Sequence, residues 1–181
     1  GGSHIHANGS GAVDNEVGSE QEAFEAIGEF LSYLPQNVWQ LPPVIESKDP
    51  TDRRDESLLS VIPRDRRHMY QIKEVINSVV DLNSFFEINP GYGESLVVGL
   101  ARLDGHSVGI MANDTMHHGG AVNATASEKM MRFVDLCDTF HIPLLNLVDN
   151  PGFLIGTQAE EEGTVRLGSR ALMACYQASI P

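Results

Sequence analysis

Hydrophobic positions recur at helical spacing in the first part of the chain, between Glu20 and Tyr33. Ser19 directly precedes this stretch and belongs to the residue types that cap helix N-termini. We therefore predict an amphipathic helix from Glu20 to about Tyr33 with one apolar face. That face contains Phe24, Ile27, Phe30, Leu31 and Leu34.

The segments on either side of this helix lack a regular hydrophobic pattern. Residues 1–19 are rich in Gly, Ser, Asn and His and are predicted to be irregular. Pro35 ends the helix, and further prolines are spread through residues 36–63. We predict that the chain divides into a first unit over residues 1–35, an extended connector over residues 36–66 and a second unit over residues 67–181.

The second unit begins with a predicted helix followed by strands. Residues 70–80 fit a helix, and residues 85–88 fit a short strand. Two β-rich runs, residues 95–102 and 106–112, flank the pair Asp104-Gly105. An Asp-Gly pair between two such runs predicts an antiparallel hairpin.

The end of the chain alternates loops and helices around one apolar strand. We predict a loop over residues 113–123, a helix over residues 125–140 and a buried strand over residues 142–148. The loop Asp149–Gly156 then leads into a last helix over residues 160–178. This order of elements predicts an α/β fold.

Charge and hydropathy argue against two classes of partner. Lys and Arg total 12 against 25 Asp and Glu, and the formal net charge of -13 would repel a nucleic acid backbone. The basic cluster of Arg53, Arg54, Arg64, Arg66 and Arg67 is interrupted by acids, which is typical of a solvated or salt-bridged segment. No apolar run approaches the roughly 20 residues of a membrane-spanning helix. We expect neither nucleic acid nor a membrane as a partner.

The two cysteines bear on the cellular compartment, and the two ends of the chain bear on whether the sequence is a fragment. Cys137 and Cys175 lie on predicted apolar helix faces without a CxxC spacing, so we predict core thiols in a reducing compartment. The chain begins at Gly1 without Met and ends at Pro181 in what resembles the start of a strand. We expect the sequence to be cut at both ends.

Two loops are candidates for a ligand site, because each leaves a strand, enters a helix and carries glycine. They are residues 113–121 and 149–156. Backbone N–H groups exposed by glycine can stabilise the negative charge that develops on a thioester or amide oxygen. Spacing alone leaves ordinary turns as the alternative. No serine nucleophile elbow, phosphate-binding loop or dinucleotide motif is present, so no side-chain nucleophile is indicated.

The histidines do not have the spacing of metal ligands. His117 and His118 are adjacent and lack the i, i+4 spacing of a helical metal pair, so we predict no metal site. His4 and His6 alternate as on a strand, and we expect both to be exposed to solvent.

The last predicted helix carries acids at its start and glycines inside. Glu160, Glu161 and Glu162 are expected to interact with the helix dipole. Gly163 and Gly168 predict close packing of this helix on another backbone, since glycine destabilises a helix interior by about 1 kcal/mol relative to alanine.

A dense series of short motifs runs along the whole chain. In the first part these are Gly1-Gly2 with His6 and Ser10-Gly11, residues 30–35 and residues 49–53. In the second part they are residues 85–87, 98–102 with Gly105, 108–110, 132–134 with Cys137-Asp138, 142–144, 151–153, Gly156-Thr157 and Arg166. In this order the motifs resemble the carboxyltransferase subunits of biotin-dependent acyl-CoA carboxylases, of the propionyl-CoA carboxylase β-subunit type.

The resemblance implies a fold and a reaction. The family folds as two crotonase-like ββα superhelical half-domains, so residues 1–35 would end the N-terminal half-domain and residues 67–181 would form the first part of the C-terminal one. The reaction would transfer a carboxyl group from carboxybiotin to the α-carbon of an acyl-CoA of the acetyl-CoA or propionyl-CoA class. The enolate formed on the way would be stabilised by backbone amides, without a side-chain base.

The resemblance also implies which residues line the site. The glycine-rich segments credited with the amide pairs would lie before Gly1 and after Pro181, so no catalytic residue is assigned. Asn113-Asp114-Thr115 stands where Asn-Gln-Pro is common in the family, Asn150 replaces a usual Val, and Ile155 replaces a frequent Pro. These departures leave the acyl specificity open. The carboxybiotin-side wall would contain Asn113, Gly119, Gly120, Pro151, Gly152, Phe153 and Gly156.

The resemblance further implies biotin on a separate carrier protein or domain, acyl-CoA as substrate, and a biotin carboxylase and a biotin carrier subunit as partners. A homo-hexamer or other homo-oligomer with sites at subunit interfaces is expected, located in the cytoplasm or, in a eukaryote, the mitochondrial matrix. These 181 residues alone are expected to be inactive. A biotin-dependent acyl-CoA decarboxylase subunit and a non-catalytic crotonase-like assembly subunit are the alternatives.

Overall fold

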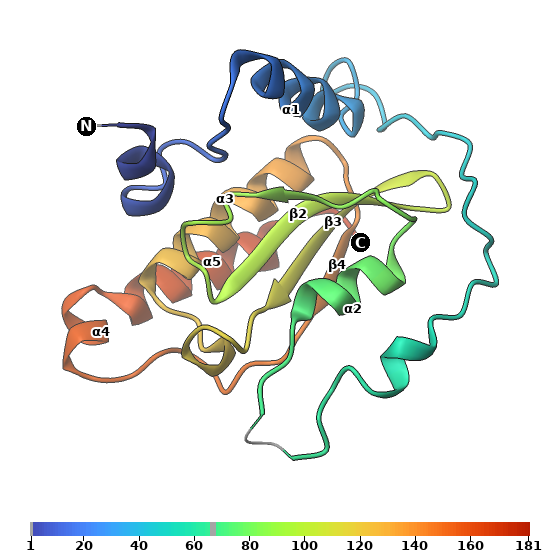
Figure 1. Cartoon of the computed structure of the whole chain (residues 1–181). Coiled ribbons are helices and arrows are strands. Elements are labelled where there is room, and N and C mark those ends of the chain that lie inside the picture. The colour runs from blue at the N-terminus through green and yellow to red at the C-terminus, as the bar shows by residue number, and fades with distance from the viewer. Residues whose placement is uncertain (1, 66–67) are drawn as a thin grey trace.

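The centre of the molecule is a four-stranded sheet in the order β1-β2-β3-β4 (Figure 1). A computed structural model describes residues 2–65 and 68–181. The strands are β1 (Phe86–Ile88), β2 (Leu96–Leu103), β3 (His106–Asn113) and β4 (Leu144–Leu147). Neighbours among the first three strands are antiparallel, and β4 runs parallel to β3. Arg66 and Arg67, and with them the predicted start of the second unit, lie outside the described residues.

Helices cover both faces of this sheet. The helices α3 (Ala124–Thr139) and α5 (Thr164–Gln177) lie on one face, and α2 (Ile72–Val79) lies on the other (Figure 1). The first helix, α1 (Glu20–Ser32), begins as predicted at Ser19, whose Oγ accepts a hydrogen bond from the Glu22 N–H at 3.2 Å. The remaining helices are short: η1 (Ile5–Gly9), η2 (Glu56–Leu59), η3 (His118–Gly120) and α4 (Thr157–Glu161). None of the helices in the described segments is long and apolar enough to cross a membrane.

The core has two layers because side chains alternate along β2. Leu96, Val98 and Leu100 pack toward α3, while Val97 and Ala101 pack toward α2. Both faces of β2 are therefore buried, which explains its nearly continuous apolar sequence.

The predicted hairpin is confirmed. Its turn residues Asp104 and Gly105 have φ values of 48° and 76°, the left-handed conformation that this kind of two-residue turn requires. The Asp81 carboxylate accepts hydrogen bonds at 2.8 Å from the N–H groups of both turn residues. A Cβ at Gly105 would lie 1.8 Å from the Ile45 carbonyl oxygen, so the connector passes directly against this turn.

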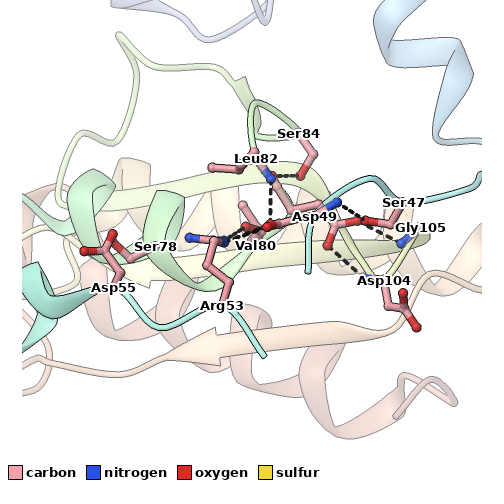
Figure 2. Close-up of polar contacts among 11 residues, drawn as sticks. Ser47, Asp49, Arg53, Asp55, Ser78, Val80, Leu82, Ser84, Asp104 and Gly105 are labelled. Carbon is pink, nitrogen blue, oxygen red and sulfur yellow. Dashed lines mark hydrogen bonds and ion pairs between the residues drawn. The ribbon is translucent and has the colours of Figure 1, made fainter. Parts of the chain in front are cut away.

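The connector is anchored to the end of α2 by polar contacts (Figure 2). Arg53 Nε lies 2.9 Å from Asp49 Oδ1, and Arg53 Nη2 donates to the Val80 carbonyl at 2.6 Å. The Leu82 N–H donates to Asp49 Oδ2 at 3.1 Å, and Ser78 Oγ donates to Asp55 Oδ2 at 2.6 Å. The predicted salt-bridged character of the basic cluster is thus confirmed at Arg53.

Several predictions about the end of the chain were wrong. The strand β4 is half-buried with an exposed Asn146, because it lies at the edge of the described sheet beside β3. The thiol of Cys137 is buried as predicted, and burial raises its pKa to about 12, but Cys175 is exposed on α5. The last helix is divided at Gly163, whose φ of 76° makes it the N-cap of α5 rather than an interior residue.

The expected exposure of two histidines is confirmed, whereas the expected interaction of three acids with a helix dipole holds for only one of them. His4 and His6 are exposed as expected, although they lie in and beside the short helix η1 rather than in an irregular segment. Of the three acids, Glu160 lies in the first turn of α4. Glu161 and Glu162 instead lie at its C-terminal end, where the helix dipole does not favour an acid.

Candidate functional site

The two candidate loops lie side by side at one edge of the sheet. We call residues 113–121 the first loop and residues 149–156 the second loop. The first loop follows β3 and the second follows β4, and because these strands are parallel both loops leave the same edge. Backbone hydrogen bonds hold the second loop to Val122, the residue that follows the first loop: the Val122 N–H donates to the Gly152 carbonyl at 3.0 Å, and the Leu154 N–H donates to the Val122 carbonyl at 2.9 Å.

Asn113 connects the two loops through its side chain. This residue ends β3 and is buried. Its Nδ2 donates to the Gly120 carbonyl at 3.2 Å, while its Oδ1 accepts from the Asp149 N–H and from Asn150 Nδ2, each at 3.2 Å. The Asn113 amide therefore holds both loops in one arrangement.

Tyr70 forms a second connection, which the sequence did not indicate. Its hydroxyl donates to Asp149 Oδ2 at 2.8 Å, and its carbonyl accepts from Thr115 Oγ1 at 3.4 Å. Burial, followed by the hydrogen bond to Asp149, raises the pKa of Tyr70 to about 12. The hydroxyl thus remains a donor at neutral pH and attaches both loops to the segment preceding α2.

The glycines of the loops fall into two groups. Gly119, Gly152 and Gly156 have φ values of 61°, 121° and 122°, and no atom lies within 4 Å of the position a Cβ would take. A Cβ at Gly120 would instead lie 2.5 Å from the Asp149 carbonyl oxygen. Gly120 therefore allows the loops to pack together, while the other three present bare backbone to open space.

Two of the backbone N–H groups are already used within the loops. The Gly152 N–H donates to Asn150 Oδ1 at 2.8 Å, and the Gly120 N–H donates to the His117 carbonyl at 2.9 Å. Neither group is free to stabilise a developing oxyanion. The geometry of these two residues therefore suits shaping a site rather than supplying its charge-stabilising donors.

A groove lies beneath the loops, with a volume of about 330 Å³. Three predicted site residues, Asn113, Gly152 and Phe153, line it together with Asn150. Its other walls come from β2, β3, β4, α3 and α5, namely Leu96, Met111, Asn146, Met130, Leu172 and Cys175, and from Val122 and Val148, which lie beside the loops. The predicted site residues Gly119, Gly120, Pro151 and Gly156 lie outside this lining.

Phe153 closes the groove against α5. A Cβ at Gly168 would lie 2.4 Å from Phe153 Cε1, so the absence of a side chain at Gly168 makes room for this ring. The predicted close packing at Gly168 is confirmed, although its neighbour is an aromatic side chain rather than a backbone.

The adjacent histidines are separated from the groove. His117 Nδ1 lies 3.6 Å from Glu94 Oε2, and His118 has a φ of 52° at the start of η3. Within residues 2–65 and 68–181, no group of three or more His, Cys, Asp or Glu side chains is arranged to hold a metal ion.

Comparison with known proteins is decisive for the family. The model of the carboxyl transferase domain matches residues 1–181. The chain belongs to this family. It is 41% identical over 181 residues to the propionyl-CoA carboxylase carboxyltransferase subunit of Haloferax mediterranei, covering 100% of this chain and 35% of that protein. It is 37% identical over 181 residues to the methylmalonyl-CoA decarboxylase subunit alpha of Veillonella parvula, covering 100% of this chain and 36% of that protein.

A solved structure confirms the predicted fold class. The carboxyl transferase domain chain superposes on transcarboxylase 12S, a hexamer holding methylmalonyl-coenzyme A, with a TM-score of 0.95 and 35% identity. The alignment covers 100% of this chain and 35% of that one. The fold is a partial crotonase-like α/β carboxyltransferase fold, and the chain spans about a third of the length of the relatives it matches.

Proposed function

We propose that this chain contributes one wall of a carboxyl-transfer site in a biotin-dependent enzyme. The wall is formed by the first and second loops and faces the biotin ring. The proposal rests on the Asn113 side chain, whose hydrogen bonds to both loops we call the joint at Asn113. In the loops fixed by this joint, Gly119, Gly152 and Gly156 present bare backbone to open space. The planar ureido group of the biotin ring system can approach such a surface closely.

The groove beneath the loops fits this role. Phe153, Val122 and Leu172 offer apolar surface, and the lining also contains Asn150, whose Nδ2 donates to Asn113 Oδ1 at 3.2 Å. Carboxybiotin, when bound, supplies the activated carboxyl group. The residues of this chain would orient the ring and exclude water, while Asn113, Gly119, Gly120, Pro151, Gly152, Phe153 and Gly156 form the contact surface.

The proposed acceptor is the α-carbon of an acyl-CoA of the acetyl-CoA or propionyl-CoA class, reached through an enolate that backbone amides stabilise. The N–H groups of Gly120 and Gly152 are used within the loops, so the proposal assigns these amides to segments outside the chain. The relative from Haloferax mediterranei, a propionyl-CoA carboxylase subunit, supports this choice of substrate class.

The reverse direction is the second candidate. A relative named methylmalonyl-CoA decarboxylase subunit alpha is 37% identical, so the same fold could remove a carboxyl group from an acyl-CoA and pass it to biotin. A non-catalytic assembly subunit is the third candidate function. The absence of any carboxyl transfer by the full-length protein would favour it.

The proposed partners are a biotin carboxylase and a biotin carrier subunit or domain. A homo-oligomer, with sites shared between subunits, is supported by the hexamer assembly of transcarboxylase 12S. We place the assembly in the cytoplasm or, in a eukaryote, the mitochondrial matrix.

The test uses the full-length protein that contains this chain. Incubation with free biotin and malonyl-, methylmalonyl- or glutaconyl-CoA should produce carboxybiotin, and the preferred donor identifies the acyl class. Absence of carboxybiotin with all three donors contradicts both transfer directions.

A variant separates a role in biotin contact from a role in folding. Gly152→Val adds a branched side chain where no atom lies within 4 Å, so it should obstruct the proposed biotin wall. Because position 152 has a φ of 121°, which disfavours a branched side chain, some loss of melting temperature is expected as well, and the rate of biotin carboxylation per folded molecule should fall at least ten-fold. A rate that falls only in proportion to lost folded protein contradicts the proposed contact.

A further inference from the structure

The strand β4 carries one polar side chain on a face that is otherwise apolar. Asn146 lies opposite Met111 of β3, and Met111 belongs to the buried cluster on the α3 side of the sheet. Leu144 packs against that cluster too, whereas Leu145 and Leu147 pack toward α2. Since side chains alternate along a strand, Asn146 lies on the face covered by α3 and α5 (Figure 1). A polar residue where the pattern calls for an apolar one indicates a local function.

The groove beneath the loops shows where this side chain points. Alternate residues line it, namely Met111 and Asn113 at the end of β3, and Asn146 and Val148 at the end of β4. Leu147, between the last two, is not part of the lining. Because alternate residues of a strand point to the same face, side chains rather than a run of backbone form this wall. The Asn146 side chain therefore faces the groove.

Three amide side chains line the groove, and two of them are engaged. Asn113 Oδ1 accepts two hydrogen bonds, and its Nδ2 donates to the Gly120 carbonyl. Asn150 donates to Asn113 Oδ1 and accepts from the Gly152 N–H. Asn146 is exposed, and its amide has no hydrogen-bond partner among residues 2–65 and 68–181. Asn146 is thus the amide whose donor and acceptor are both entirely unused.

The size and chemistry of the groove fit the biotin ring system at this amide. An engineered cavity of about 150 Å³ holds benzene, so by proportion a groove of about 330 Å³ has room for about twelve heavy atoms. The bicyclic ring of biotin together with its transferable carboxyl group has about that size. One edge of a cyclic urea presents an N–H donor beside a carbonyl acceptor, and an asparagine amide presents the complementary pair.

We propose that Asn146 is a positioning residue that pairs with the ureido edge of biotin, an inference that rests on the proposed function. Its Nδ2 donates to the ureido oxygen, and its Oδ1 accepts from the ureido nitrogen that does not carry the carboxyl group. This edge keeps its N–H and its oxygen in both biotin and carboxybiotin, so Asn146 holds both forms. The pair orients the ring and leaves the other nitrogen free to gain or lose the carboxyl group.

Asn146→Leu in the full-length protein tests the pair, because leucine has a similar size and neither donor nor acceptor. We expect the KM for free biotin to rise about ten-fold and kcat to stay within about three-fold, since two hydrogen bonds made alike in the bound and transition states are lost. Asn77→Leu is the matched control, because Asn77 is an exposed amide of α2 on the other face of the sheet. An unchanged KM in Asn146→Leu, or an equal rise in Asn77→Leu, overturns the assignment.

Cys175 provides a readout that does not depend on turnover. This exposed thiol lines the same groove, whereas Cys137 is buried. Biotin should slow the alkylation of Cys175 by iodoacetamide saturably, as followed by peptide mass spectrometry, and Asn146→Leu should need about ten-fold more biotin for the same protection. Cys137 should stay unlabelled throughout. Equal protection of Cys175 in the unmodified protein and in Asn146→Leu overturns the assignment.

The two readouts separate this inference from the proposed function. If the full-length protein forms no carboxybiotin with any donor, the proposed function fails, while protection of Cys175 that depends on Asn146 still supports the ureido pair. If the protein transfers carboxyl groups but biotin does not slow the labelling of Cys175, the proposed function stands and the placement of the ring beside Asn146 is overturned.

Discussion

Tyr70→Phe removes a single hydroxyl and keeps the aromatic ring. That hydroxyl donates to the Asp149 carboxylate at 2.8 Å and holds the second loop against the segment before α2. A hydrogen bond to a charged group contributes about 1.5–3 kcal/mol when buried, and the half-buried position of Tyr70 reduces this to about 1 kcal/mol. Such a change corresponds to about a five-fold shift in an equilibrium constant.

If the attached position of the second loop is needed for transfer, kcat/KM for carboxylation of free biotin should fall about five-fold in this variant. The assay measures initial rates of carboxybiotin formation in the full-length protein with methylmalonyl-CoA as donor. Tyr92→Phe is the matched control. Its hydroxyl also donates to a carboxylate, that of Glu128, and its pKa is also raised to about 12 by burial, but its hydrogen bonds involve neither loop.

The pH dependence follows from the direction of the shift. The pKa of Tyr70 rises from 10.0 to about 12, so its stabilising contribution is complete below pH 10 and is lost between pH 10 and 12. The difference between Tyr70→Phe and the unmodified protein should therefore be constant from pH 7 to 9. An unchanged rate in Tyr70→Phe, or an equal loss in Tyr92→Phe, would refute the reasoning.

Two further predictions concern packing and the joint between the loops. Gly109→Ala should lower the free energy of unfolding by about 1–3 kcal/mol in denaturant titrations, because the new Cβ would lie 2.6 Å from Cys137 Sγ. Gly28→Ala lies at an open position of α1 and should instead raise the free energy of unfolding by about 0.5–1 kcal/mol. Comparable destabilisation by both variants would contradict the packing argument. Asn113→Ala removes a buried amide with three hydrogen bonds, so it should lower the free energy of unfolding by about 2–3 kcal/mol and abolish carboxyl transfer. Thr115→Val loses one long hydrogen bond and should lower the free energy of unfolding by less than about 1 kcal/mol. A smaller cost for Asn113→Ala than for Thr115→Val would show that the loops are held elsewhere.

Local chemistry made parts of the fold predictable. The hairpin depends on two adjacent residues, Asp104 and Gly105, that accept positive φ, and the start of α1 depends on Ser19 capping the helix. Both signals act within a few residues, so a single sequence carries them. The placement of the two loops at the same end of the sheet depends instead on the parallel pairing of β3 and β4, which the sequence analysis did not predict.

Contacts between distant segments were not predictable in the same way. Tyr70 and Asp149 are separated by 79 positions. The sequence placed Tyr70 in a predicted helix over residues 70–80, whereas α2 begins at Ile72, and it gave no indication of the partner of Tyr70. The exposure of Cys175 depends on how α5 packs against α3. These features arise from tertiary packing, to which local sequence patterns are insensitive.

The joint at Asn113 restricts how this region can be redesigned. Position 113 must both donate and accept hydrogen bonds: aspartate would lack the donor that meets the Gly120 carbonyl, and leucine would lack both functions. Positions 113, 120 and 149 should therefore be kept constant together in any library of variants. Ile155, at 88% exposure, can be varied freely to explore which ligands the surface accepts.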